Sequence, residues 1–326
     1  MAGFMKATVC VRRVSGYAPG VMADSIAGLI ESLGGWGRFV KRGDRVLVKP
    51  NMVGASPPDH VSMTHPVVVA EVCRTLLDFG ARPFVGDSPA WGSLGGCARK
   101  LGLIPLLDDL GVELVRFNRP RKVRNESGRV FRHLTVDAAA LEADAIVSVP
   151  KFKTHRQLFM TIALKNLFGC VSGKRKAWWH VKAGNFENYF ALMLVETFAL
   201  LKPAVTIIDA VVAMEGNGPM RGTPRPLSMM LASDDGGALE RVGCELVGAR
   251  PEQLPTLIAA RQLGVGTTDL DQIELQGGTL DEFRVRDFAF GKPLAIGFSL
   301  PRVVKSTLKN AWLVYKERAA ERSLGS

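Results

Sequence analysis

Residues 143–155 read Ala-Asp-Ala-Ile-Val-Ser-Val-Pro-Lys-Phe-Lys-Thr-His, a short apolar run followed at once by polar residues. A continuous apolar run of this length is typical of a strand buried on both faces, as in a parallel sheet. Similar runs recur, and the predicted strands are residues 45–49, 82–85, 143–149, 204–208 and 227–232. Helical patterns separate or follow them at residues 66–79, 187–201, 238–247 and 251–263. This alternation predicts an α/β fold with a mostly parallel sheet or sheets and flanking helices.

Polar residues follow every predicted strand. In open α/β sheets, ligands bind beyond the carboxyl ends of the strands, so these residues are expected to converge on one cleft, between two lobes if the fold is divided. Asp, Asn and Ser are also ordinary turn formers, which is the favoured reading of Ser88 and Asp234 taken singly. Lysine is not a preferred turn former. The candidate binding residues at these strand ends are Lys49, Asn51, Asp87, Ser88, Lys151 and Lys153.

The chemical centre of the sequence is residues 150–169. Lys151, Lys153 and His155 stand at a strand end, and Lys165 and Asn166 come just before Leu-Phe-Gly. A lysine between Leu164 and Leu167 is expected to be partly buried, which lowers its pKa and suits it to nucleophilic or proton-transfer chemistry. The alternative is a lysine that reaches solvent or pairs with a carboxylate. Lys165 and His155 are therefore the candidate catalytic pair, with Asn166 as a binding residue.

A basic segment, Gly173-Lys-Arg-Lys-Ala-Trp-Trp-His180, follows. It predicts a lid with glycine-rich ends that closes over an anionic ligand and carries His180 as a further catalytic candidate. The alternative is a nucleic-acid contact, with cations on phosphate and Trp on a base. His155 and His180 are also candidate ligands of a divalent metal, although their separation makes any shared metal dependent on tertiary folding.

Residues 208–222 are predicted to be a strand end followed by a glycine-rich acidic loop. Asp209 and Glu215 are candidates for acid–base chemistry or cation binding, and Asn217 is a candidate binding residue in the same loop. The alternative is a tight, self-capped loop. Pro219 and Pro224 exclude a dinucleotide-binding fingerprint because they block a helix from starting here.

The net charge of +11 is concentrated in two stretches of the chain. Residues 151–186 hold eight basic residues and no acidic one, which indicates a local anion site and makes nucleic acid the less expected partner. Residues 299–322 hold six basic and two acidic residues among apolar ones, which is typical of an amphipathic helix on a membrane surface. A helix packed on the domain is the alternative. The expected organisation is one α/β domain over residues 1–298, with a lobe boundary near 185–203, and a basic segment over 299–326.

Five cysteines are present without a C-x-x-C pair, so the chain has no zinc-ribbon or iron–sulfur motif. Reduced, buried thiols in a cytoplasmic protein are the expectation. Residues 1–10 lack a signal-peptide pattern, and no apolar stretch approaches the length of about 18 residues that a membrane span needs.

Five ordered motifs resemble the domain of unknown function 362 family over about residues 45–277. They are Val-Lys-Pro-Asn (48–51), Gly-Asp-Ser-Pro (86–89), Pro-Lys-Phe-Lys-Thr-His (150–155), Leu-Lys-Asn-Leu-Phe-Gly (164–169) and Ala-Met-Glu-Gly-Asn-Gly-Pro (213–219). Many members of this family carry an added iron–sulfur module, which this chain lacks. The resemblance implies the α/β fold and leaves the activity open.

A remoter likeness is to nickel-pincer lactate racemase, in which a His, a Lys ten residues later and a more distant metal-binding His follow a strand. His155, Lys165 and His180 are similarly arranged. The likeness implies that Lys165 contacts a cofactor and that His155 or His180 binds a metal or moves a proton. Asp87-Ser88 stands where that family has another His, so only the idea of a shared site is carried over, without the nickel or the reaction.

Two functions are expected from these observations. The first is an enzyme, either an isomerase or an oxidoreductase, that acts on a small carboxylate or phosphate by lysine–histidine acid–base or metal-assisted chemistry. The second is a non-catalytic accessory or binding protein that uses its basic surface on a membrane, through residues 299–322, or on nucleic acid.

Overall fold

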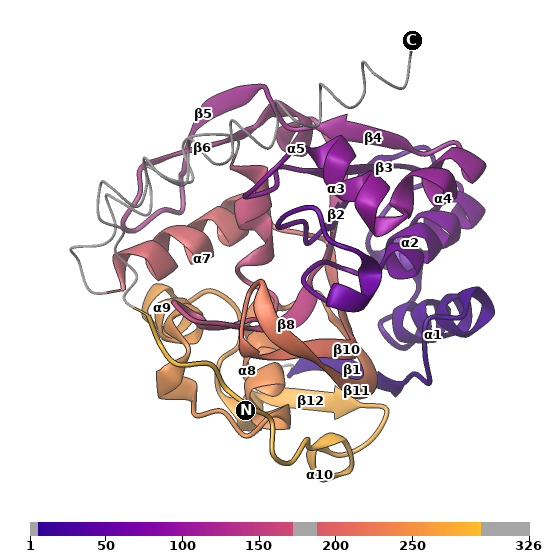
Figure 1. The fold of residues 1–326 in the computed structure, drawn as a ribbon. Coiled ribbons are helices and arrows are strands. Elements are labelled where there is room, and N and C mark those ends of the chain that lie inside the picture. Colours follow the sequence, from indigo (N-terminus) through magenta and orange to yellow (C-terminus); the bar gives the residue numbers. More distant parts are fainter. Residues whose placement is uncertain (1–5, 172–187, 295–326) are drawn as a thin grey trace.

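The computed structural model describes residues 6–171 and 188–294. These residues form a ten-stranded mixed sheet in the order β12-β1-β11-β10-β7-β2-β3-β4, with β8 joined to β10 and β9 joined to β8 (Figure 1). The strands are β1 (Ala7–Arg13), β2 (Arg45–Pro50), β3 (Arg82–Asp87), β4 (Glu113–Arg116), β7 (Ala145–Val149), β8 (Lys151–His155), β9 (Phe159–Thr161), β10 (Val205–Asn217), β11 (Arg221–Ser233) and β12 (Ile273–Gln276). A separate two-stranded ribbon consists of β5 (Pro120–Arg124) and β6 (His133–Asp137).

The centre of the sheet is parallel, as the sequence predicts. β4, β3, β2 and β7 run in one direction, and the first part of β10 continues that set beside β7. Alternate residues of β2 face opposite cores: Val46 and Val48 belong to one apolar cluster and Leu47 to another. Burial on both faces explains why these strands read as continuous apolar runs. The α/β class is confirmed.

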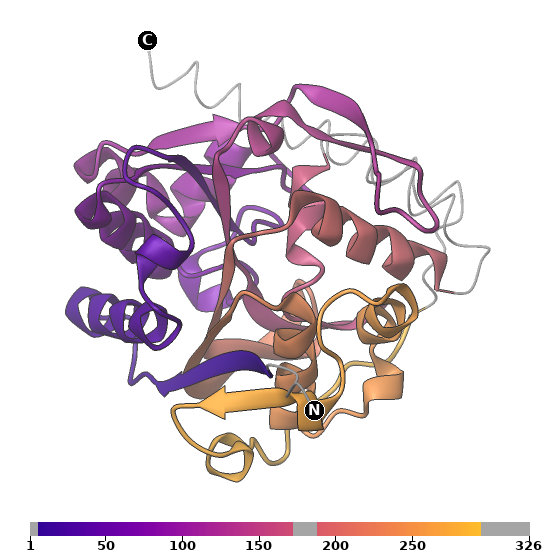
Figure 2. The same ribbon diagram turned by 180° about the vertical axis from the view of Figure 1, so that it is seen from behind.

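Helices cover both faces of the sheet, as Figures 1 and 2 show. One face carries α1 (Pro19–Ser32), α2 (Pro66–Phe79), α3 (Leu94–Leu101) and α4 (Leu103–Asp109). The other carries α5 (Ala138–Leu141), α7 (Tyr189–Leu201), α8 (Gly236–Leu246) and α9 (Pro255–Leu263). The short helix α10 (Leu280–Phe283) follows β12. In this described part of the chain, no helix is both long enough and apolar enough to cross a bilayer.

Local sequence sets the ends of α2 at the predicted residues. Pro66 takes the first helical position, where its missing N–H costs nothing, and the His65 side chain accepts a hydrogen bond from the Val67 amide. Gly80 ends the helix in the left-handed conformation with a φ of 96°.

The prediction of a glycine-rich loop after residue 208 is wrong. β10 continues to Asn217 and pairs antiparallel with β11, so residues 205–233 form one long hairpin. The reversal also places Asp234, after β11, at the opposite end of the sheet from the ends of β2 and β3. There Asp234 pairs with Arg38 at 2.5 Å. Apolar runs do not reveal strand direction, which is why the predicted convergence fails for Asp234.

Residues 151–155 are themselves a buried strand rather than a polar turn. Pro150 separates β7 from β8, and β8 then pairs with β10 through Lys151 and Asp209. All five residues of β8 are buried. The strand thus carries two lysines and a histidine into the interior at the carboxyl end of β7.

Candidate functional site

The carboxyl ends of the parallel strands bring together polar residues that are far apart in the sequence. Lys49 ends β2, Asp87 ends β3, and Lys151 of β8 lies opposite Asp209 of β10. Ion pairs between buried side chains join Lys49 to Asp87 and Lys151 to Asp209. The convergence predicted for them is therefore observed in the contacts.

Lys49 and Asp87 form a buried ion pair with 2.8 Å between Nζ and Oδ2. Lys49 also donates to the Pro50 carbonyl at 2.5 Å, and Asp87 Oδ2 accepts from the Met52 amide at 2.9 Å. Gly169 packs directly on the pair, because a Cβ at that position would lie 2.3 Å from Asp87 Oδ1 and 2.4 Å from Lys49 Nζ. The glycine of Leu-Lys-Asn-Leu-Phe-Gly is thus required by close approach. Ser88 completes this corner, since its amide donates to the Gly169 carbonyl at 3.2 Å.

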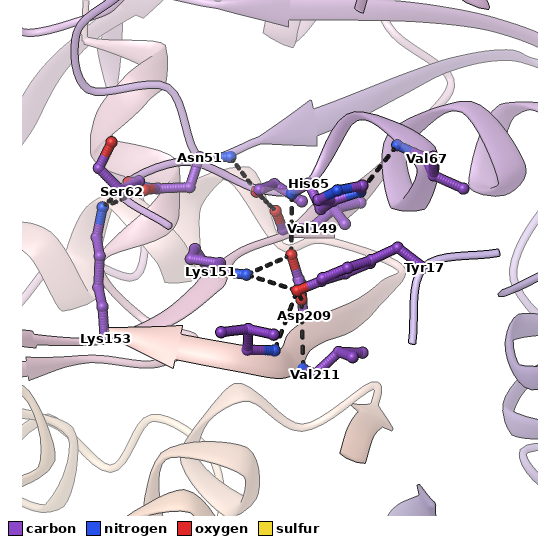
Figure 3. Close-up of polar contacts among 12 residues, drawn as sticks. Tyr17, Asn51, Ser62, His65, Val67, Val149, Lys151, Lys153, Asp209 and Val211 are labelled. Atoms are coloured by element: carbon purple, nitrogen blue, oxygen red, sulfur yellow. Dashed lines mark hydrogen bonds and ion pairs between the residues drawn. The ribbon is translucent and has the colours of Figure 1, made fainter. Parts of the chain in front are cut away.

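Lys151 and Asp209 form a second buried pair at 2.9 Å, which Figure 3 shows at the centre of a wider network. The Tyr17 hydroxyl donates to Asp209 Oδ1 at 2.8 Å and accepts from Lys151 Nζ at 2.9 Å. The His65 amide donates to Asp209 Oδ2 at 2.9 Å. Asp209 therefore serves as an acceptor for groups from four segments of the chain, including the Val211 amide.

Tyr17 and His65 belong to this network, although no sequence motif marks either residue. Their rings stack with 3.6 Å between centroids. Burial lowers the pKa of His65 to about 4, with Lys151 acting in the same direction and Asp209 opposing it. Burial and the nearby Asp209 carboxylate raise the pKa of Tyr17 far above its ordinary value. Both rings are therefore neutral near pH 7. Tyr17 stands alone before α1, without a local motif to mark it.

Lys153 is fully buried and has no carboxylate contact in the described residues. Its Nζ donates to Asn51 Oδ1 at 2.5 Å and to the Ser62 carbonyl at 2.6 Å (Figure 3). Burial first, and then the cations Lys165 and Lys151, hold its pKa well below the ordinary lysine value. A lysine with neutral acceptors alone is favoured in its uncharged amine form.

Asn51 and Asn166 connect the Lys153 amine to the end of β2. Asn51 Nδ2 donates to Asn166 Oδ1 at 3.3 Å, and Asn166 Nδ2 donates to the Lys49 carbonyl at 2.9 Å and to Ser148 Oγ at 3.0 Å. The two amides therefore fix the end of β2 against the segment that carries Lys165. Both asparagines are candidates from the sequence, and their contacts here are with protein groups.

Lys165 differs from the other three lysines. It precedes the 3₁₀ helix η3 (Asn166–Cys170), and its side chain is partly buried, as the sequence predicts. Burial, followed by the Lys49 cation, lowers its pKa to about 8, while Asp87 opposes the shift. Within residues 6–171 and 188–294, no group accepts a hydrogen bond from its ammonium. Lys165 is thus the amine at this end of the sheet that the acceptors of the described residues leave available.

His155 is buried, and its Nδ1 accepts from the amides of Gln157 at 3.3 Å and Leu158 at 3.2 Å. These bonds occupy the Nδ1 lone pair and favour the tautomer with its proton on Nε2. The described part of the chain has no group of three His, Cys, Asp or Glu residues suited to hold a metal ion. The described residues therefore do not make a metal site around His155, and His180 lies outside them.

Glu215 and Asn217 have other partners. Glu215 Oε2 accepts from the Ala289 amide at 3.0 Å and lies 4.0 Å from Arg225, and Asn217 Oδ1 accepts from the Lys292 amide at 3.4 Å. Both residues stand on the distal half of β10, beyond the irregular pairing at Ala210 to Val212. The described contacts do not connect them to the lysines, because the predicted loop is a hairpin that carries them away along the strand.

The electrostatic balance of the site is positive. Four lysines, Lys49, Lys151, Lys153 and Lys165, share two carboxylates, Asp87 and Asp209. Each carboxylate is already paired, so among the described residues Lys165 has no carboxylate of its own, and Lys153, with neutral acceptors alone, is favoured as the uncharged amine. The excess of positive charge attracts an anion, which would in turn favour the protonated form of Lys165.

Comparison with known proteins gives a family and a curated relative. A model of the family described as "Domain of unknown function (DUF362)" matches residues 46–245. The Thylakoid-associated protein sll1697 of Synechocystis sp. is 40% identical over 310 residues, which cover 95% of this chain and 96% of that protein.

Two solved structures are more distantly similar. The lactate racemase apoprotein from Thermoanaerobacterium thermosaccharolyticum has a TM-score of 0.47 and 12% identity, over 74% of this chain and 57% of that one. A Thermotoga maritima protein has a TM-score of 0.36 and 14% identity, over 66% of this chain and 55% of that one. This chain thus spans little more than half of either structure, and similarity at these scores says nothing about activity.

Proposed function

This chain belongs to the DUF362 family, and we propose that it is an enzyme acting on a small anionic substrate, a carboxylate or a phosphate, with Lys165 as the proton-transfer or nucleophilic group. The family expected from the sequence motifs is confirmed, whereas the activity is our proposal. The observation that supports it is the contrast among the four lysines. Three have protein acceptors for their ammonium groups, and Lys165 has none in the described residues.

The chemistry follows from the charges. Lys165, which has no carboxylate of its own in the described part of the chain and is protonated below its pKa of about 8, would attract the anionic group of the substrate. Because its pKa is lowered to about 8, Lys165 is partly unprotonated near neutral pH and has a lone pair that can accept a proton or attack a carbonyl carbon. Lys49 would stabilise negative charge that develops nearby, since its position is fixed by Asp87. Proton transfer next to a carboxylate is the isomerase chemistry that this arrangement suits.

Of the two histidines predicted as metal ligands, His155 is the one within the described residues. Its Nδ1 already accepts hydrogen bonds from two backbone amides. We therefore derive no step through a metal. His155 remains a candidate proton carrier through Nε2, and His180 remains a candidate outside the described residues. Glu215 and Asn217, with other partners, have no part in the proposed step.

Thermal unfolding with a panel of small carboxylates and phosphates tests the proposal on three proteins: the unmodified chain, Lys165→Met, and Lys100→Met on the exposed face of α3. A ligand at about 100 times its Kd adds about 2.7 kcal/mol to the free energy of unfolding, or roughly 5 °C in Tm for a chain of this size. The shift should persist in Lys100→Met and shrink in Lys165→Met. Equal shifts in all three proteins would remove Lys165 from the site.

A second candidate function is that of an accessory protein on a membrane surface. A relative with 40% identity is named as thylakoid-associated, and the chain carries a net charge of +11 that suits an anionic surface. The segment first predicted to make this contact, residues 299–322, lies outside the described residues. Nucleic acid remains the less favoured partner, and the cytoplasmic location remains a prediction.

A further inference from the structure

The ribbon formed by β5 and β6 is strongly basic. Residues 116–133, here called the basic ribbon, contain seven basic residues and one acidic residue, Glu126. The basic side chains are all exposed and are those of Arg116, Arg119, Arg121, Lys122, Arg124, Arg129 and Arg132. Apart from Arg116, which ends β4, the basic ribbon lies outside the main sheet, at the periphery of the molecule beside α7 (Figures 1 and 2).

Few of these charges are neutralised by neighbours. Arg119 pairs with Glu142, and Arg124 pairs with Glu126. The other five basic residues form no ion pair within the described part of the chain. Their charge faces solvent, where an external anionic surface can reach it.

The alternation of side chains along β5 shows which side of the ribbon faces outward. Val123, Leu134 and Val136 face the core beside α7, so Lys122 and Arg124 of β5 point to the opposite side. His133, opposite Arg124 in the register, is exposed as well.

A buried carboxylate holds the tip of the ribbon in place. Glu196 of α7 accepts hydrogen bonds from the amides of Arg129, Val130 and Phe131 at 2.7 to 2.9 Å, and from Asn125 Nδ2 at 3.1 Å. The turn has no room for a side chain at Gly128, because a Cβ there would lie 2.4 Å from the Phe131 carbonyl oxygen. The side chains of Arg129 and Val130 are thus presented outward on a fixed backbone, so binding through them would order little further chain.

The exposed side chains of the ribbon suit lipid headgroups better than nucleic acid. Its two phenylalanines, Phe117 and Phe131, are buried, so residues 116–133 expose no Phe, Tyr or Trp on which a base could stack. The aliphatic side chain of Val130, at the tip, is 39% exposed among the cations. Cations around an exposed aliphatic group match an anionic headgroup layer above acyl chains.

We propose that the basic ribbon docks the protein on an anionic lipid surface. The proposal assigns a surface to the second candidate function, and rests on it for the class of partner. It differs from the C-terminal contact predicted from the sequence, because it needs residues 116–133 only. It is independent of the Lys165 site, which lies at the carboxyl ends of the central strands.

Co-sedimentation of the full chain with vesicles tests the proposal. The vesicles are phosphatidylcholine alone, or phosphatidylcholine with about a third phosphatidylglycerol. The test variant replaces Lys122, Arg124, Arg129 and Arg132 with Ser, which removes four exposed charges, of which Arg124 alone has an ion-pair partner, Glu126, among the described residues. The matched control replaces Lys41, Arg42, Lys100 and Arg286 with Ser, and so removes the same charge from exposed positions elsewhere.

The unmodified chain and the control should bind the anionic vesicles, and bind less as salt is added, whereas the ribbon variant should lose at least tenfold in partition coefficient. Binding by the unmodified chain that both variants retain, or lose equally, would overturn the ribbon assignment and leave membrane association standing. Failure of the unmodified chain to bind would overturn both. Binding to double-stranded DNA is measured at the same salt concentration. A ribbon variant that loses DNA binding but keeps vesicle binding would also overturn the proposal.

Discussion

The ammonium of Lys151 lies 2.9 Å from the carboxylate of Asp209, and neither side chain has more than 1% of its surface exposed. Two buried charges are stable only as a pair with further hydrogen bonds, because each one alone has lost its hydration. Tyr17 and the His65 amide supply such bonds. The pair is therefore a structural unit whose two halves are expected to be interdependent.

Asp209→Asn should cost about 3–5 kcal/mol in the free energy of unfolding, since it leaves Lys151 buried without a counter-charge. The double variant Lys151→Met with Asp209→Asn should be less destabilised than Asp209→Asn alone. Urea unfolding at pH 7 measures both. A double variant that is less stable than the single one would show that the network, rather than the charge pair, dominates.

Gly169→Ala should cost about 2–4 kcal/mol, because the added methyl group enters the space of the buried Lys49–Asp87 pair. Gly20→Ala is the matched control: it lies in the first turn of α1, and a Cβ there meets no atom within 4 Å. That variant should retain the stability of the unmodified chain. Similar stability of the two variants in urea would contradict the close approach at Gly169.

The stability of the protein should fall as the pH drops from about 6.5 to about 4, in part because of His65. Its pKa is lowered to about 4 in the folded state, so the unfolded chain binds more protons in this range and is favoured by acid. A shift of this size corresponds to a loss of about 3 kcal/mol.

His65→Asn keeps a side-chain acceptor at the start of α2 and removes the titration. The variant should therefore lose less stability than the unmodified chain between pH 7 and pH 4.5, when each is unfolded in urea at both values. An identical loss would mean that His65 is protonated as readily in the folded state as in the unfolded one.

Lys165 should react with amine-directed reagents at lower pH than solvent-exposed lysines, which as a class titrate near 10.4. Reductive methylation over a pH series, read out by peptide mass spectrometry, should give half-maximal labelling of Lys165 near pH 8. Protection of Lys165 by a stabilising anion from the thermal panel would link the amine to the ligand. Labelling of Lys165 that rises only above pH 10 would show that its environment does not lower its pKa.

The sequence predicted the parts of the fold that depend on local pattern. The parallel strands, the limits of α2, and the meeting of Lys49, Asp87, Lys151 and Asp209 follow from apolar runs and from the rule that strand ends share one edge of the sheet. The hairpin was missed because Gly216, Gly218 and Pro219 resemble a loop, whereas pairing with β11 keeps residues 209–217 extended.

Local sequence patterns do not predict the features that depend on tertiary contacts. Tyr17 enters the site only through the packing of the segment before α1, and Glu215 lies away from it because β10 continues to Asn217. The basic ribbon was hidden because acidic residues elsewhere balance its charge in a count over the remaining chain. The imbalance of residues 116–133 is present in the sequence itself, and the structure adds that all seven basic side chains are exposed.

The alternation of β8 has a consequence for how the chain finds its alignment. Lys151 and Lys153 point to the polar side of this strand, and Phe152 between them points into the apolar cluster with Met160 and Ile208. A slip of one residue would force two amines into hydrocarbon and a phenyl ring among carboxylates, and neither could be accommodated. The buried lysines therefore fix the register of β8 against β10 and disfavour the registers shifted by one residue.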